Sequence, residues 1–480
     1  MDPLIILLVG ILVVVGGILG LRLHAFLALL LGAFVVALCT PQFAVEMYAL
    51  SKGMSAEAAT AMAGQSVGQR IATAFGATAG KIGILIAMAA IIGKCMLESG
   101  AAEKIVRSTL QITGDGGAPV TFLGSSFFLG IPVFFDTVFY LMVPLAKAMA
   151  MRLGKNYLLL ILCITAGAAM ANSLVPPTPG PLFLISEMNI PIGMMMVGGF
   201  LVGLCTIVAG YFFAAWANAK WPIPLRDSID APIKNIKALA ARDTSNLPGL
   251  FSSTLPILIP LVFITGRAAM VSLWPASDVA IMTELEHWVR ASVDFLGEKN
   301  LALVAGAFAA LVQLVRQKKE EGKALVESVQ AALMSGGVII LITAAGGAFG
   351  GMLQQTGISA RIAELTEGYQ MALIPLAFLI TAVVRTAQGS ATVAMITASG
   401  ILSGMANEAQ LDYHQLYLGL AIACGSKLIP WMNDSGFWIV CKMSNLTEKE
   451  ALKTFSPLLT IMGLVGLVVI LIAAKAIPLV

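Results

Sequence analysis

Four charged residues of this sequence lie in or beside segments that are otherwise apolar. Asp136, Arg385, Lys427 and Asp434 each follow or interrupt a long uncharged run. A charge in such a setting is costly unless it has a partner or a water-filled cavity. Arg385 offers a guanidinium fork that matches a carboxylate, and a buried Asp136 or Asp434 could bind and release a proton. These residue types predict a site for a small organic anion that moves together with an ion.

Hydroxyl and amide side chains lie near these charges and suit the hydroxyl groups of a small acid. They are Ser390, Thr392, Thr178, Asn172 and Asn433. We assign them to the substrate together with Arg385, and we assign Asp136, Asp434 and Lys427 to ion coupling. Two other interpretations stay open. The aspartates can be structural partners of Arg385 and Lys427, and Lys427 can take a second carboxylate or the place of a coupling cation.

Two hairpins are predicted to position these residues. The stretch 118–129 is too short to cross a bilayer, stops at Gly130-Ile131-Pro132 and is followed by another apolar stretch. The stretch 371–384 stops in the same way at RTAQGS (385–390), and the apolar 391–405 follows. We expect both to enter the membrane and turn back, so that backbone N–H groups at the tips, including that of Gly130, can bind an anion.

The sequence also repeats itself weakly. GKCMLESGAAEKI (93–105) matches GGMLQQTGISARI (350–362), and ANSLVPPTPGP (171–181) matches GSKLIPWMNDS (425–435), at offsets of 257 and 254 residues. In the second pair proline and glycine interrupt an apolar span, which releases backbone groups that must face protein or water. Two homologous halves, each with one hairpin and one interrupted span, are typical of secondary transporters.

Composition defines the class of protein. The chain has 480 residues, of which 58% are hydrophobic and 11% charged, whereas soluble domains are about a quarter charged. Repeated uncharged runs long enough to cross a bilayer predict an all-α polytopic membrane protein with 11 to 12 spans. The basic segments 220–242 and 316–323 belong in the cytoplasm by the positive-inside rule, and Arg22 places the N-terminus outside. Counting spans from these points gives the two halves inverted topologies.

We expect four segments. Residues 1–80 would form N-terminal spans and an extended loop that serve as a scaffold, and 81–218 the first repeat. Residues 219–335 would form cytoplasmic loops and connecting spans, and 336–480 the second repeat.

Other function classes lack support in the sequence. The net charge of +3 is small and dispersed, which argues against a nucleic-acid partner. GATAGKI (76–82) resembles a phosphate loop but lacks its Ser or Thr, and no zinc or hydrolase motif is present. The six cysteines have no paired spacing that would indicate a metal or a disulfide. No cofactor and no enzyme activity are predicted, and a passive anion channel or an intramembrane enzyme using Asp136 and Asp434 is the alternative from another class.

Four motifs in order resemble the gluconate:proton symporter family, the gluconate permeases. They are GIPVFFDTVFYLMVPL (130–145), PPTPGP (176–181), VVRTAQGSATVAMITASGI (383–401) and NDSGFW (433–438) with NLT (445–447). The similarity covers essentially the whole chain. It implies a multi-pass inner-membrane symporter of a sugar acid such as gluconate, related to ion transporters that form homodimers in contact with membrane lipid. It also implies a transport domain that carries both hairpins and slides against a scaffold, as in an elevator.

The resemblance implies binding-site roles residue by residue. The positions that match the family motifs are Arg385, Gly389, Ser390, Thr392, Asn433 and Asp434. We therefore expect a secondary active transporter that moves a gluconate-like acid with protons by alternating access. Sodium as the coupled ion, and D-serine or a dicarboxylate as the cargo, are the nearest alternatives.

Overall fold

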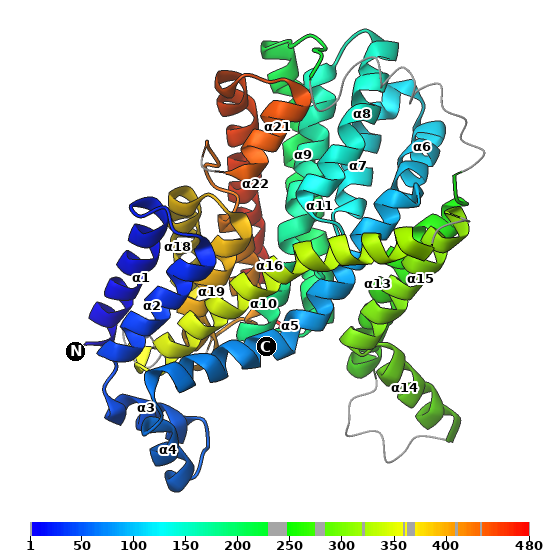
Figure 1. Ribbon diagram of the computed structural model, residues 1–480. Coiled ribbons are helices and arrows are strands. Elements are labelled where there is room, and N and C mark those ends of the chain that lie inside the picture. Colours follow the sequence, from blue (N-terminus) through cyan, green and yellow to red (C-terminus); the bar gives the residue numbers. More distant parts are fainter. Residues whose placement is uncertain are drawn as a thin grey trace.

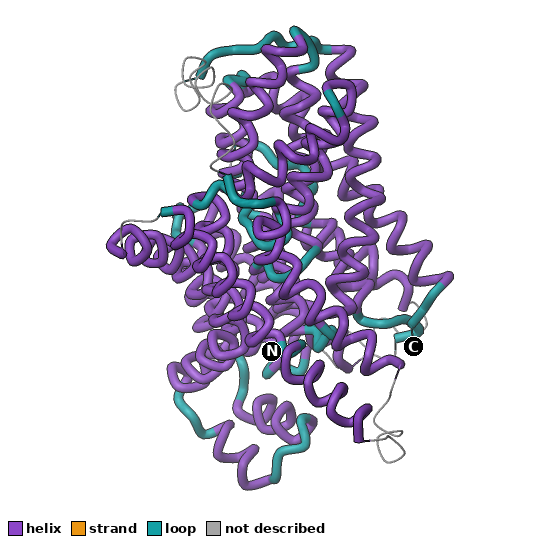
Figure 2. The backbone as a smooth tube through the Cα atoms, turned by 90° about the vertical axis from the view of Figure 1, so that its right-hand side faces the viewer, coloured by secondary structure: helices purple, strands orange, loops and turns teal. Residues whose placement is uncertain are grey.

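The computed structural model shows a protein built from helices. It describes residues 2–228, 247–273, 284–318, 322–358, 361, 370–408, 411–432 and 434–479. Every regular element in these ranges is a helix, and most connections between helices are short (Figure 2). The predicted all-α class is therefore confirmed for the described part of the chain.

The helices of the N-terminal half include several that begin with proline. Their bounds are α1 (Pro3–Leu19), α2 (Ala25–Cys39), α3 (Gln42–Ser51), α4 (Ala56–Ala63), α5 (Val67–Glu98), α6 (Ala101–Thr113), η1 (Asp115–Gly117), α7 (Ala118–Leu129), α8 (Phe135–Leu153), α9 (Tyr157–Leu174), α10 (Pro179–Glu187) and α11 (Ile192–Lys220). Proline lies in the first turn of α1, α7 and α10, where its fixed φ angle and missing N–H cost nothing.

The C-terminal half contains the remaining helices, and their lengths from α16 onward resemble those from α5 onward. Their bounds are α13 (Leu250–Leu273), α14 (Glu284–Leu296), α15 (Lys299–Gln317), α16 (Gly322–Gln354), η3 (Gln370–Ala372), α18 (Leu373–Gln388), α19 (Ala391–Glu408), α20 (Leu416–Gly425), α21 (Ser435–Ser444) and α22 (Glu448–Ala476). A capping box between Thr447 and Glu450 fixes the start of α22.

Seven helices in the described ranges are long and apolar enough to cross a membrane, or up to eight if the bent pair α2–α3 forms one span. This number is lower than the expected 11 to 12. Four further apolar helices, within α1, α18, α19 and α20, are only 10 to 17 residues long, which is less than the roughly 20 residues that a full crossing needs.

Burial separates the centre of the molecule from its lipid-facing surface. The α9–α10 segment is 94% buried, whereas the other candidate spans are 28 to 50% buried. Exposed apolar side chains recur about every four residues along α11, at Leu201, Leu204, Val208, Phe212 and Trp216. Such a stripe suits lipid rather than water, so α9 and α10 form the core and the surrounding spans face the bilayer.

The segment between Pro41 and Lys81, expected as an extended loop, is mainly helical. Ser55 caps α4 and Ser66 caps α5, each accepting a hydrogen bond from a backbone N–H of the first turn. Helix α5 begins at Val67, so the expected boundary at residue 81 lies inside a continuous helix. The expectation of a loop was wrong because the polar residues of this segment are helix caps and exposed helical faces.

The predicted breaks lie where two helices meet end to end. Helix α7 ends at Leu129 and α8 begins at Phe135, while α18 ends at Gln388 and α19 begins at Ala391. The two helices of each pair pack against each other. The α9–α10 and α20–α21 pairs are likewise separated by the short proline-containing segments that the sequence indicated. Figure 1 shows α16 and α5 crossing the molecule beside these pairs.

Candidate substrate site at the helix breaks

The N-termini of four helices surround one hollow in the molecule. Residues from the first turns of α8, α10, α19 and α21 line a cavity of about 330 Å³, which we call the large cavity. A helix N-terminus has unpaired N–H groups and the positive end of the helix dipole, so it attracts anions. The two hairpins and the two interrupted spans therefore all contribute to one cavity.

A smaller cavity of about 130 Å³, which we call the small cavity, adjoins the large one. The two share six lining residues, which are Phe135, Asn172, Ser390, Thr392, Ser435 and Gly436. The small cavity adds three charged residues to its lining, Arg385, Lys427 and Asp434. Asp136 lines only the large cavity, so the four predicted charges lie around one continuous space.

Arg385 is fully engaged with the protein in this structure. It lies in the last turn of α18 and is 3% exposed. Its Nε donates to the carbonyl oxygen of Ser426 at 2.9 Å, its Nη1 donates to the carbonyl oxygen of Gly389, and its Nη2 forms an ion pair with Asp434. Arg385 thus connects the second hairpin to the second interrupted span. This contact matches the interpretation, left open by the sequence, that an aspartate is the structural partner of Arg385.

Asp434 has two roles at the start of α21. One carboxylate oxygen accepts from the backbone N–H of Gly436 at 2.7 Å and caps the helix, and the other pairs with Arg385. Both carboxylate oxygens of Asp434 are therefore occupied, and Asp434 is the counter-ion of Arg385.

Lys427 is a buried cation beside this pair. It lies between α20 and α21, is 4% exposed and lines the small cavity. Among the described residues no hydrogen bond or ion pair to its Nζ is formed. A desolvated ammonium without a hydrogen-bond partner is energetically costly. Of the two cations that line the small cavity, Lys427 is the one without such a partner among the described residues.

The amide of Asn172 faces the same space. Its Oδ1 is buried and has no hydrogen-bond partner, although Asn172 lines both cavities. Native proteins rarely leave such an atom unpaired. Thr392 also lines both cavities, and Ser390 lines them while its Oγ caps α19 by accepting from Val393 N at 3.3 Å.

Several residues expected in the site are placed elsewhere. Thr178 Oγ1 donates to the carbonyl oxygen of Val175 at 3.0 Å, and Thr178 lines neither cavity. Gly130 packs against α9 near Ala168 and Ala171. Gly389 ends α18 with a φ of +88°, a conformation that favours glycine, and binds Arg385 through its carbonyl oxygen. Asn433 lies outside the described residues.

Asp136 lies at the rim of the site. It is exposed in the first turn of α8, where Oδ1 accepts from the backbone N–H of Thr137 at 2.9 Å. Within the described ranges no group of three or more His, Cys, Asp or Glu side chains could hold a metal ion.

The sequence did not reveal the contribution of α16 to the large cavity. Ser335, Ile339, Ile342 and Thr343 of this helix line it. From residue 331 onward α16 has no charged residue that would show which of its faces meets the hairpins. Ser435 belongs to the NDSGFW motif (433–438). Its position at the start of α21 could have indicated that it lines the cavities.

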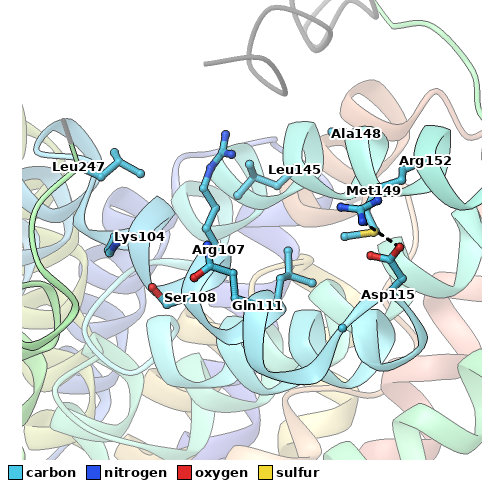
Figure 3. A pocket seen from close by; sticks show the side chains of 12 residues that line it. Lys104, Arg107, Ser108, Gln111, Asp115, Leu145, Ala148, Met149, Arg152 and Leu247 are labelled. Carbon is cyan, nitrogen blue, oxygen red and sulfur yellow. Dashed lines mark ion pairs between the residues drawn. The ribbon is translucent and has the colours of Figure 1, made fainter. Parts of the chain in front are cut away.

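A separate hollow of about 500 Å³ lies between α6 and α8 (Figure 3). Its basic side chains include Arg107, which pairs with Glu103, and Arg152, which pairs with Asp115. The Arg152–Asp115 pair is 69% and 45% exposed, so water already solvates these charges. This hollow lacks the buried, unpaired groups that distinguish the cavities at the helix breaks.

Comparison with known proteins agrees with this architecture. The sequence profile described as GntP family permease matches residues 2–476. The chain is 31% identical to a gluconate permease of Pseudomonas aeruginosa, over 83% of this chain and 85% of that protein. It is 28% identical to the inner membrane permease YgbN of Escherichia coli K12, over 97% of each chain.

A solved structure has the same fold. The crystal structure of the Alcanivorax borkumensis YdaH transporter superposes with a TM-score of 0.60 at 14% identity, covering 85% of this chain and 88% of that one. The candidate spans and the relatives together make this chain a multi-pass protein of the inner membrane, and a transporter rather than an enzyme. Because the family profile covers nearly its whole length, the chain belongs to the GntP permease family.

Proposed function

We propose that the protein takes up a gluconate-like sugar acid together with protons across the inner membrane. The observation that carries this proposal is the convergence of four helix N-termini and the buried Lys427 on one cavity. Each of these features favours an anion. The hydroxyl and amide groups of Asn172, Ser390 and Thr392 suit the hydroxyls of a sugar acid, and the relative from Pseudomonas aeruginosa is named a gluconate permease.

The charges favour a monocarboxylate over the alternatives. In the lining of the small cavity the charges of Arg385 and Asp434 neutralise each other. Lys427 therefore gives this cavity one net positive charge, which one carboxylate would neutralise. A dicarboxylate would bring a second negative charge for which Arg385 is not free. D-serine would need an acceptor for its ammonium group near Lys427, and the carboxylate of Asp434 is already occupied.

Two inverted repeats would build this site. The order of helices supports the repeats, because α5 has 32 residues and α16 has 33, while α11 and α22 have 29 each. Between them each half has a helix pair with a short break and an interrupted span. In the proposed arrangement 81–218 and 336–480 are the repeats, 219–335 connects them and 1–80 belongs to the scaffold of a homodimer surrounded by lipid.

An elevator-type motion would carry the site across the membrane. In this motion α16 and the second hairpin would shear past each other. Their backbones come close at one pair of glycines, since a Cβ added to Gly350 of α16 would lie 2.7 Å from the Cα of Gly400 of α19. The side chain of Ile396 of α19 packs against Gly346 of α16 and would have to move.

Competition for transport would identify the cargo. We expect an excess of unlabelled gluconate or of a stereoisomeric aldonate to suppress uptake of labelled gluconate into proteoliposomes. D-serine and succinate should not suppress it, because the described lining of the small cavity has one unpaired cation, Lys427, and its carboxylate, that of Asp434, is already paired. Suppression by D-serine or succinate but not by aldonates would overturn the assignment of the cargo.

A further inference from the structure

The identity of the proton-carrying group follows from the charges around the small cavity, and it rests on the function proposed above. Lys427 is nearly inaccessible to solvent and faces a cavity rather than a counter-ion. Arg385 and Asp434 form a neutral pair next to it. With Lys427 protonated, the empty small cavity therefore has a net charge of +1. Water is largely excluded from this region, so an unpaired charge there is energetically costly.

Neither aspartate is suited to bind and release the proton. Both carboxylate oxygens of Asp434 are engaged, one by Arg385 and one by the N–H of Gly436, and loss of the ion pair would leave a buried guanidinium without its counter-ion. Asp136 is exposed at the rim of the large cavity, so water stabilises its charge whether or not the site is occupied. The sequence alone suggested both aspartates, and the contacts argue against both.

Lys427 has two charged neighbours and one further titratable neighbour among the described residues. Arg385 on α18 and Asp434 before α21 are the charged residues of the lining, and Cys424 on α20 is the other titratable group that interacts with it. The lining residues from α9, α19 and α22 are uncharged. They are Ala169, Asn172, Ser390, Ala391, Thr392, Phe455 and Leu459. The guanidinium of Arg385 repels a second cation beside it, whereas the carboxylate of Asp434 attracts one.

Two states of the site are electrically neutral. In one, the Lys427 ammonium pairs with a bound carboxylate. In the other, the site is empty and Lys427 is an uncharged amine. A carrier that crosses the membrane only in these two states must move one proton with each monocarboxylate, because the charged alternatives carry the cost of an unpaired buried charge.

We propose that Lys427 carries the transported proton. On the outer side its amine takes a proton from water, and the resulting ammonium binds the substrate carboxylate. On the inner side the carboxylate leaves, and the N–H bond of the ammonium breaks to return the proton to water. The amine then travels back empty, so each cycle moves one anion and one proton and transfers no net charge.

Lys427→Arg separates binding from proton release. Arginine keeps the positive charge that binds a carboxylate but remains protonated at all working pH values. The variant should still exchange labelled for unlabelled gluconate across the membrane. Its net uptake driven by a pH gradient should fall by a factor of about 10³ or more, because the deprotonated fraction of arginine near neutral pH is below about 10⁻⁵. Lys442→Arg, on the exposed side of α21, is the matched control and should keep both activities.

Net uptake by Lys427→Arg at the wild-type rate would overturn the assignment of the proton to Lys427. A measurement on the unmodified protein gives an independent test that does not depend on the folding of a variant. A potassium diffusion potential set with valinomycin should not drive uptake, whereas a pH gradient should. Uptake driven by the potential alone would contradict the proposal. If the unmodified protein shows no gluconate uptake with either gradient, the proposed function itself fails, which is a different result.

Discussion

Arg385→Ala is expected to destabilise the folded protein by about 3–5 kcal/mol, because it leaves the buried carboxylate of Asp434 without its counter-ion. The same change removes the bonds to the carbonyl oxygens of Ser426 and Gly389, which tie the second hairpin to the second interrupted span. Thermal unfolding of the purified protein in detergent measures the loss. Transport should also be lost, because Arg385 would no longer connect the segments that line the small cavity.

Two further variants separate the ion pair from general effects of losing an arginine. Arg152→Ala removes an exposed ion pair with Asp115 and should cost about 0–1 kcal/mol. The double variant Arg385→Ala with Asp434→Asn keeps a capping residue at the start of α21 and leaves no unpaired charge. It should recover most of the stability but not the transport. Equal stability of Arg385→Ala and Arg152→Ala would show that the buried pair does not have the role described here.

Asn172→Leu is expected to weaken substrate binding without weakening the fold. Leucine has the same branched skeleton as asparagine but cannot hydrogen-bond a substrate hydroxyl. The buried Oδ1 of Asn172 has no hydrogen-bond partner when the site is empty, which is energetically unfavourable. Replacing the amide should therefore leave the free energy of unfolding unchanged or raise it by about 1 kcal/mol. Affinity for gluconate should fall about 10- to 100-fold, which corresponds to roughly 1–3 kcal/mol.

The neighbouring Ser173 provides the control. Its Oγ is also buried and unpaired, but Ser173 lines neither cavity. Ser173→Ala should therefore leave affinity unchanged. Titration calorimetry and thermal unfolding on the same preparations measure both quantities. Unchanged affinity in Asn172→Leu, or an equal loss in Ser173→Ala, would mean that the unpaired amide oxygen is not a substrate contact.

Local sequence signals predicted the breaks of the fold well. The expected stretch 118–129 coincides with α7, since a glycine and a proline follow it at once. The second hairpin was placed correctly apart from residues 385–388, which the sequence put in the break and the structure puts at the end of α18. Proline and glycine act on neighbouring backbone, so their effects can be read from the sequence without knowing the fold.

Long-range pairing could not be predicted in the same way. Arg385 and Asp434 are 49 residues apart, and the sequence offered a substrate carboxylate as an equally good partner for the guanidinium. The lining contributed by α16 depends on which face of its uncharged C-terminal part meets the hairpins. The segment before α5 was misjudged for another reason, because its serines are helix caps and not loop residues.

Concentrative uptake of labelled gluconate into proteoliposomes tests the central claim most directly. With an alkaline interior and no membrane potential, the protein should accumulate gluconate above the outside concentration, and the uptake should saturate. Collapse of the pH gradient with a protonophore should reduce the accumulation to equilibration. Accumulation that is independent of the pH gradient, or flux that rises linearly with gluconate concentration without counterflow, would contradict proton-coupled transport through this site.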